Sequence, residues 1–193
     1  MSLSRFVKVL GVFGFVVCII SYLYLTHVLI MNSIGIIASH FNVPKLMVER
    51  YVMAMLSMLY AFSIIGFLVG WVIYAAILHG FLKAFKIDSK FGTTFLLSGH
   101  YFYASTISIL LTYWTLITNS SYLTKFVLYR TMPVEVYAYG IVFTIIIASI
   151  YVALLLSREY NTSMKKVLIA TIITNTILYT LGQIITTTYK PTI

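Results

Sequence analysis

Five long stretches of the chain contain no Lys, Arg, Asp or Glu, and this absence of charge constrains the fold more than any other feature. The stretches are residues 9–44, 51–82, 91–124, 136–157 and 167–189. A helix needs about 20 residues to cross roughly 30 Å of hydrocarbon at about 1.5 Å per residue, so each stretch is long enough for one such helix. We therefore predict an all-α, polytopic membrane protein with a bundle of five transmembrane helices, near residues 9–31, 51–79, 95–118, 136–156 and 167–187.

The composition supports this class of protein and excludes others. Hydrophobic residues make up 61% of the 193 residues and charged residues only 9%, whereas a soluble domain carries about 25% charged residues. So few charges cannot cover the surface of a soluble enzyme. The apolar runs are continuous and lack the alternating pattern of a membrane barrel. The longest predicted loops, residues 32–50 and 119–135, are short, so we expect residues 1–193 to form a single transmembrane domain.

Lys and Arg residues are distributed unequally between the two sides of the predicted bundle. Eight of the 13 lie on the side of the amino terminus and five on the opposite side. Cytoplasmic loops carry an excess of positive charge, so the prediction is a cytoplasmic amino terminus and an outside carboxyl terminus. We expect the first apolar stretch to be a retained helix rather than a cleaved signal, because it is too long for a signal core and lacks a small-x-small cleavage site.

Small and polar residues recur at helical spacing within three of the predicted helices. Small residues let another helix approach closely, and hydroxyl and amide side chains bond across helices in lipid. The residues predicted to pack helices together are Gly66, Gly70, Ser105, Ser108, Thr112, Asn175 and Gln183. Helix packing by the two glycines would serve either the internal bundle or dimerisation. The polar residues offer an alternative, a substrate path through the membrane.

No acidic or basic residue lies within the five predicted helices, which disfavours an ion pump. His79 and His100 near the cytoplasmic ends of the second and third helices are the residues that a proton relay or metal site would have to use. No carboxylate or cysteine is near enough in the sequence to complete such a site, so we interpret both as interfacial residues. We predict no metal, no cofactor and no catalytic residues.

The connection after the second predicted helix has an interfacial pattern. Phe81 and Phe85 fall on one side of a helix and Lys83, Lys86 and Lys90 on the other. Aromatic residues enter the headgroup layer while lysines contact anionic lipid, although the same lysines would also suit an acidic cytosolic partner. The formal charge of +9 is spread over every loop, so we predict contact with the lipid bilayer and no binding of nucleic acid.

Two short motifs are similar to known functional patterns. Ser98-Gly99-His100 and a later Ser157-Arg158 are similar to the membrane lipid phosphatases, but Met164 stands where the nucleophilic histidine of that pattern should be. Without a nucleophile we reject this activity. Asn119 begins a glycosylation sequon that faces outside in the predicted topology.

Residues 70–101 combine a helix that ends in a His-containing apolar sequence, a short basic connection and a Gly-aromatic step that opens the next helix. The residues concerned are Gly70-Trp71, Ala75-Ala76, His79-Gly80, Lys90-Phe91 and Leu97-Ser98-Gly99-His100-Tyr101. This segment resembles the central part of the YIP family, the Ypt/Rab-interacting membrane proteins and their prokaryotic relatives. It departs from the family where Lys86-Ile87-Asp88-Ser89 replaces a glycine pair and where Ser105 replaces a proline.

The resemblance implies a short, prokaryote-type member in a plasma membrane, with a non-enzymatic role and no Rab-binding function. Together with the packing residues, it predicts a protein that acts by helix association, as a homo-oligomer or with partner membrane proteins. The alternative is a small transporter or channel component for an uncharged solute.

Overall fold

The computed structural model describes residues 3–188, and every regular element in this range is helical. The elements are α1 (Arg5–His40), α2 (Lys45–Ala84), α3 (Phe91–Ser98), α4 (Tyr101–Thr118), α5 (Ser120–Tyr129), α6 (Val134–Tyr139), the π-helix η1 (Gly140–Ile147), α7 (Ala148–Glu159) and α8 (Met164–Thr188). Five segments are long and apolar enough to cross a membrane: residues 5–40, 45–84, 91–118, 134–159 and 164–184. The predicted all-α fold with five such helices is confirmed.

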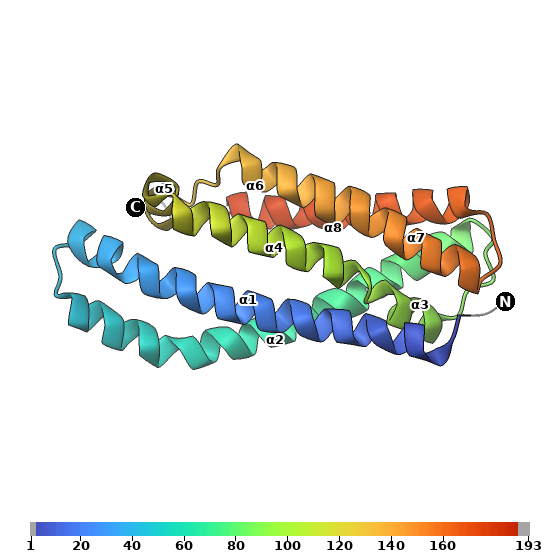
Figure 1. Ribbon diagram of the computed structural model, residues 1–193, viewed down its shortest axis with the longest axis horizontal. Helices are drawn as coiled ribbons and strands as arrows, with labels where there is room; N and C mark the ends of the chain where they lie inside the picture. The colour runs from blue at the N-terminus through green and yellow to red at the C-terminus, as the bar shows by residue number, and fades with distance from the viewer. Residues whose placement is uncertain (1–2, 189–193) are drawn as a thin grey trace.

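The long helices run side by side along the long axis of the molecule (Figure 1). α1 contacts α2, α3, α4 and α5, and α7 packs on α8. α8 also contacts α2, and α7 contacts α3 and α4. The start of α1, the α2–α3 connection and the α7–α8 connection share one end of the bundle, which we call the amino-terminal end.

The first two helices are longer than predicted, and the predicted loop at residues 32–50 is wrong. α1 continues to His40, and only residues 41–44 connect it to α2. α1 ends where Asn42 adopts a left-handed conformation (φ 51°) and Val43 N donates to Ala38 O at 3.0 Å, an arrangement that caps helix carboxyl ends. At 1.5 Å per residue, the 36 residues of α1 and the 40 of α2 extend about 54 and 60 Å, about twice the hydrocarbon thickness.

The third predicted helix, residues 95–118, is interrupted. α3 ends at Ser98, α4 begins at Tyr101, and Gly99 and His100 form a turn between them. The turn keeps helix-like dihedral angles, and His100 N donates to Leu97 O at 3.2 Å. The two helices therefore remain one membrane-crossing segment with a break near its amino-terminal end.

The fourth predicted helix, residues 136–156, contains the π-helix η1. A π-helix adds a residue to the turn and shifts the side chains that follow it. Gly140 begins η1, and a Cβ atom there would lie 2.5 Å from the Tyr179 ring of α8. The glycine thus makes room for close packing of the fourth and fifth spans.

The predicted loop at residues 119–135 is also largely helical. The Asn119 side chain accepts hydrogen bonds from Ser121 N and Tyr122 N, at 3.1 and 3.3 Å, and so caps α5. Leu123 of α5 packs with Leu29 of α1 and Leu116 of α4. This small apolar cluster holds α5 against the bundle at the end opposite the amino-terminal end.

The main core lies in the half of the bundle nearer the amino-terminal end. It is built from apolar side chains of α1, α2, α3, α4, α7, α8 and the α2–α3 connection: Phe15, Cys18, Trp71, Tyr74, Leu78, Leu82, Ile87, Leu97, Phe102, Val152, Ala153, Leu156, Val167 and Ala170. By contrast, most large apolar side chains in the first part of α2 are exposed. The bundle is therefore packed more tightly near its amino-terminal end than near the opposite end.

Two glycines allow α1 to touch the α3–α4 turn backbone to backbone. A Cβ at Gly11 would lie 1.9 Å from Leu96 O, and a Cβ at Gly99 would lie 2.4 Å from Gly11 O. No side chain fits at either contact without moving a helix backbone. Near this crossing, His100 Nε2 bonds Val7 O at 2.8 Å and Tyr103 donates to Leu10 O at 2.9 Å.

We predict that Gly11→Ala destabilises the protein, because the added methyl group forces α1 away from α3. Overpacking of this kind costs about 1–3 kcal/mol, so the midpoint of thermal unfolding in mild detergent should fall by several degrees, at about 2–4 °C per kcal/mol. Gly35→Ala is the matched control on the same helix, since nothing lies within 4 Å of a Cβ there. An equal effect of the two substitutions would contradict the close crossing.

Candidate functional site

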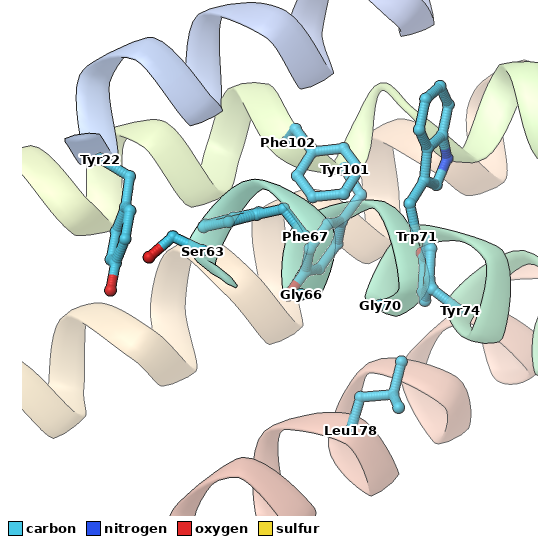
Figure 2. A pocket seen from close by; sticks show the side chains of 10 residues that line it. All are labelled: Tyr22, Ser63, Gly66, Phe67, Gly70, Trp71, Tyr74, Tyr101, Phe102 and Leu178. Atoms are coloured by element: carbon cyan, nitrogen blue, oxygen red, sulfur yellow. The ribbon is translucent and has the colours of Figure 1, made fainter. Parts of the chain in front are cut away.

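A cavity of about 450 Å³ opens on the side of the bundle between α1, α2, α4 and α8. We call it the lateral cavity. Figure 2 shows Tyr22 and Ser63 at one end and Trp71 and Tyr74 at the other. Its lining is largely aromatic and otherwise small or aliphatic: Tyr22, Ser63, Gly66, Phe67, Gly70, Trp71, Tyr74, Tyr101, Phe102 and Leu178. Its volume is within the range of about 300–1,000 Å³ that is usual for small-molecule sites.

One face of α2 forms a wall of this cavity. Ser63, Gly66, Gly70 and Tyr74 follow one another at steps of three or four residues, which places them on the same face of a helix. Nothing lies within 4 Å of a Cβ placed at Gly66 or at Gly70. The predicted packing glycines therefore make no close contact with another helix in the part of the chain that the structure describes.

Trp71 fixes the position of α2 at the inner edge of the lateral cavity. Its indole ring is stacked between Phe15 and Phe95, with ring centroids 4.5 and 4.1 Å away. The indole N–H donates to Phe95 O at 3.2 Å and to Ser98 Oγ at 3.0 Å. Because these contacts lie on α1 and α3, they hold α2 firmly from Trp71 onward.

A buried polar cluster lies beside the cavity, between α2, α7 and α8. Asn175 is 1% exposed, and its Nδ2 donates to Ser149 Oγ at 2.7 Å. Thr171 donates to Ser149 O at 3.2 Å, so both residues bond across the α7–α8 interface. The Tyr74 hydroxyl and Asn175 Oδ1 are fully enclosed, and neither forms a hydrogen bond of standard geometry with the described part of the chain.

The predicted polar face of the third span points inward. Ser105 and Ser108 are buried and Thr112 is half-buried. The hydroxyls of Ser105 and Thr112 donate to the carbonyl four residues earlier, at 3.2 and 2.8 Å. Gln183 lies about two turns beyond Asn175 on α8 and is partly exposed. None of these side chains is among the described residues that line the lateral cavity.

The two histidines considered for a metal site have separate environments. His79 Nδ1 bonds Ser89 Oγ at 3.0 Å and its ring contacts Phe91 edge-on. His100 is buried against α1 and its ring contacts Tyr151 edge-on. Within residues 3–188, no group of three or more His, Cys, Asp and Glu is placed to hold a metal.

The predicted interfacial helix over Phe81–Lys90 is wrong in its second half. α2 ends at Ala84, and Lys86 has a left-handed conformation (φ 58°) that turns the chain toward α3. Phe81 and Phe85 are half-buried and pack against the core, and Leu82 between them is fully buried. The exposed side chains of this segment include all three lysines, Lys83, Lys86 and Lys90.

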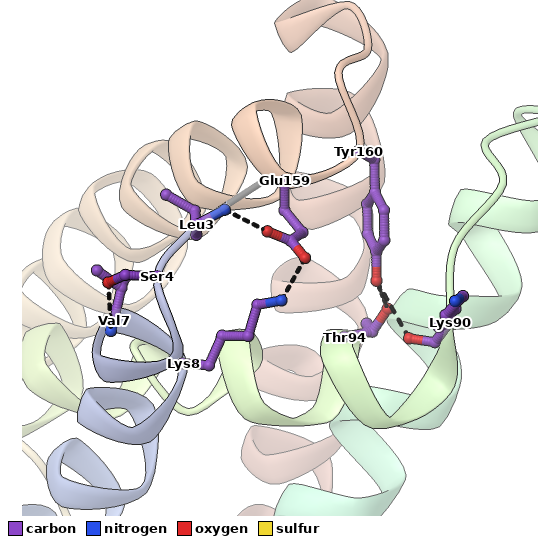
Figure 3. Close-up of polar contacts among 8 residues, drawn as sticks. All are labelled: Leu3, Ser4, Val7, Lys8, Lys90, Thr94, Glu159 and Tyr160. Atoms are coloured by element: carbon purple, nitrogen blue, oxygen red, sulfur yellow. Dashed lines mark hydrogen bonds and ion pairs between the residues drawn. The ribbon is translucent and has the colours of Figure 1, made fainter. Parts of the chain in front are cut away.

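Polar contacts at the amino-terminal end join α1 to α7 (Figure 3). Lys8 pairs with Glu159, whose second oxygen accepts from Leu3 N at 2.6 Å. The side chains of Lys8 and Glu159 are 21% and 9% exposed, so the pair is better shielded from water than a surface salt bridge.

Tyr160 makes a second connection at this end. It donates to Lys90 O at 3.1 Å, and Thr94 bonds the same hydroxyl at 2.9 Å. Burial raises the pKa of Tyr160 above 10.0, although both hydrogen bonds oppose the change. The phenol therefore stays neutral at physiological pH and keeps its proton to donate.

The close-packing glycines are the functional residues that the sequence analysis missed. Gly11, Gly14, Gly99 and Gly140 each lie where a Cβ would be 2.7 Å or less from another helix. Gly11 and Gly14 are three residues apart, a spacing that could have drawn attention to α1. Their partners are distant in the sequence, so spacing alone does not identify the contact.

Comparisons of the chain with protein-family models, with curated proteins and with solved structures find no match. The YIP resemblance of residues 70–101 therefore stays a prediction from the sequence.

We predict that Glu159→Gln lowers stability, because the substitution removes the charge that Lys8 faces in a partly buried site. Breaking such a pair costs about 1–3 kcal/mol after allowance for its partial exposure. Thermal unfolding in detergent measures the effect, with Asp88→Asn as control. Asp88 pairs with Lys83 at 3.3 Å, but its side chain is fully exposed, so the control should change little. Equal midpoints for both variants and the parent would refute a structural role for Glu159.

Proposed function

We propose that the protein is a non-enzymatic, multi-pass integral membrane protein of the YIP type that acts by helix association, with a second copy or with partner membrane proteins. The observation that carries this proposal is the free glycine face of α2. Gly66 and Gly70 lie on one face of a long helix, and a Cβ at either position would have nothing within 4 Å among the described residues of the other helices. Glycine lowers helix stability by about 1 kcal/mol relative to alanine, so this pair has no stabilising use within the monomer.

The length of the α1–α2 hairpin supports the same proposal. The end of the hairpin that carries the α1–α2 connection extends beyond α4 and α8 (Figure 1). A row of large apolar side chains is exposed along the first part of α2: Leu46, Met47, Tyr51, Met53, Met55, Met58, Leu59, Phe62, Ile65, Leu68 and Val69. A helix about twice as long as the hydrocarbon thickness must tilt or associate to keep such a surface out of water. Association with another membrane protein would cover this apolar surface of α2.

The proposed location is a prokaryotic plasma membrane, with the amino-terminal end of the bundle in the cytoplasm. The excess of Lys and Arg on that side supports this orientation. Lys83, Lys86 and Lys90 are exposed there, in position to contact anionic headgroups.

The alternative of a transporter for an uncharged solute has less support from the geometry. The hydroxyls of Ser105 and Thr112 are used within α4 itself. Solute flux into vesicles, lost in Asn175→Leu, would favour this alternative.

We predict that replacing both Gly66 and Gly70 by Leu weakens association by about 10-fold or more, or about 1.4 kcal/mol. A Cβ at either position meets no atom of the described residues within 4 Å, so we expect α2 to accept the added side chains, and thermal unfolding in detergent checks that the variant is folded. Energy transfer between donor- and acceptor-tagged copies in vesicles measures self-association. Co-purification from native membranes measures association with other membrane proteins.

Gly80→Leu is the matched control, because Gly80 is also an exposed glycine of α2 with nothing within 4 Å, and it lies outside the lateral cavity. The control should associate like the parent protein. Unchanged association of the double variant in both assays would overturn the proposal.

A further inference from the structure

We infer that the amino-terminal end of the bundle binds an anionic lipid whose head carries two phosphate groups. The site lies where the α7–α8 connection meets the start of α3, and its cations are Lys90, Arg158 and Lys166. The inference rests on one part of the proposed function, the placement of this end of the bundle at a membrane surface. It does not depend on association of the helices.

The first argument is the number of unpaired cations at this end. Lys8 pairs with Glu159 and Lys83 pairs with Asp88, so both acidic residues of this end already have a basic partner. The other basic residues there are exposed and form no ion pair with a carboxylate among residues 3–188: Arg5, Lys86, Lys90, Arg158, Lys165 and Lys166. These cations remain for an anion from outside the chain.

The level of the cations matches that of lipid headgroups. On this side of the bundle, each of the five charge-free stretches is closed by a cation: Lys8, Lys83, Lys90, Arg158 and Lys166. A charged side chain is costly in hydrocarbon, so these residues mark the boundary between the hydrocarbon and the headgroup layer. Because Lys8 and Lys83 have partners, the other three are left to meet a phosphate at this boundary.

The fold brings these three cations to the ends of neighbouring helices. Lys90 directly precedes α3, Arg158 lies in the last turn of α7, and Lys166 lies in the first turn of α8. α7 packs on both α3 and α8. The Tyr160 hydroxyl donates to Lys90 O at 3.1 Å and so holds the α7–α8 connection against the start of α3 (Figure 3).

Exposed apolar side chains lie beneath two of the cations, on the hydrocarbon side. Leu154 is four residues before Arg158 on α7, and Ile169 is three residues after Lys166 on α8, so each shares a helix face with its cation. Leu154 is 37% exposed and Ile169 is 40% exposed. A phospholipid, with its phosphate above its hydrocarbon chains, fits this order. An acidic protein segment would use the cations alone.

The charge of the site selects the head of the lipid. A phosphodiester carries one negative charge, so a head with a single phosphate neutralises only one of the three cations. Lys165 adds a further positive charge beside Lys166, in the first turn of α8, where the positive end of the helix dipole disfavours cations. A head with two phosphates brings more negative charge to the site and offers Arg158 a partner for paired hydrogen bonds.

Native mass spectrometry of the purified protein in mild detergent counts the lipids that each molecule binds. The lipid probes share the same two oleoyl chains: dioleoylglycerol pyrophosphate has two phosphates, dioleoyl phosphatidylglycerol has one, and dioleoyl phosphatidylcholine is zwitterionic. A polyglutamate peptide tests for an acidic protein partner. Binding is read on the mass of the monomer, so association of copies does not contribute.

We expect the dissociation constant of the two-phosphate lipid to be about 10-fold lower than that of phosphatidylglycerol, as one or two additional cation contacts would give. Phosphatidylcholine should bind most weakly. The triple variant Lys90→Gln, Arg158→Gln and Lys166→Gln should lose the preference between the two anionic lipids. The double variant Lys90→Arg and Lys166→Arg should keep it, because both charges remain.

The matched control is the triple variant Lys45→Gln, Lys125→Gln and Arg130→Gln. It removes the same number of exposed positive charges from the opposite end of the bundle, and it should keep the preference. Thermal unfolding in detergent checks that both triple variants are folded.

Equal dissociation constants for the two anionic lipids would overturn the inference. An equal loss of preference in both triple variants would also overturn it, because net charge rather than this site would then govern binding. Polyglutamate binding that depends on the three cations, without a preference among the lipids, would assign this end to an acidic protein instead. The glycine-dependent association is measured separately and is unaffected by any of these results.

Discussion

The rest of the structure depends on the backbone contact between α1 and the α3–α4 turn. Gly11 and Gly99 bring two chain segments together so closely that no side chain fits between them. In lipid, helices have no hydrophobic drive to associate, and close packing of small residues takes its place. Trp71, His100 and the Lys8–Glu159 pair add specific contacts on the same half of the bundle. The amino-terminal half is therefore the rigid part of the molecule.

The opposite half of the bundle is more loosely packed, because these contacts are concentrated in the amino-terminal half. α2 is held from Trp71 onward, but its earlier turns extend away with α1 and leave Gly66 and Gly70 facing the lateral cavity. A bundle packed equally along its length would have used these glycines internally. Instead, the two glycines and the aromatic lining of the lateral cavity lie on one side of the molecule. We propose association on the glycine face as the use of that side.

The sequence predicted the helices well and their ends poorly. Charge-free runs locate the five spans because charge is costly in hydrocarbon, but the ends of α1 and α2 depend on local capping by residues such as Asn42. The break at Gly99 and the π-helix from Gly140 depend on contacts with Gly11 and Tyr179, which are distant in the sequence. At the site, spacing placed Gly66 and Gly70 on one face correctly. The bond between Asn175 and Ser149 needed the three-dimensional arrangement of α7 and α8.

The most direct test of the central claim is photo-crosslinking in living cells from the exposed face of α2. Phe62, 62% exposed, is replaced by a photoreactive phenylalanine analogue, and Trp114, 70% exposed on α4, serves as the reference position. The account predicts a discrete protein adduct from position 62, with a second copy or another membrane protein, and none from position 114. Adducts with lipid alone at both positions would contradict it, because α2 would then present its free face only to the bilayer.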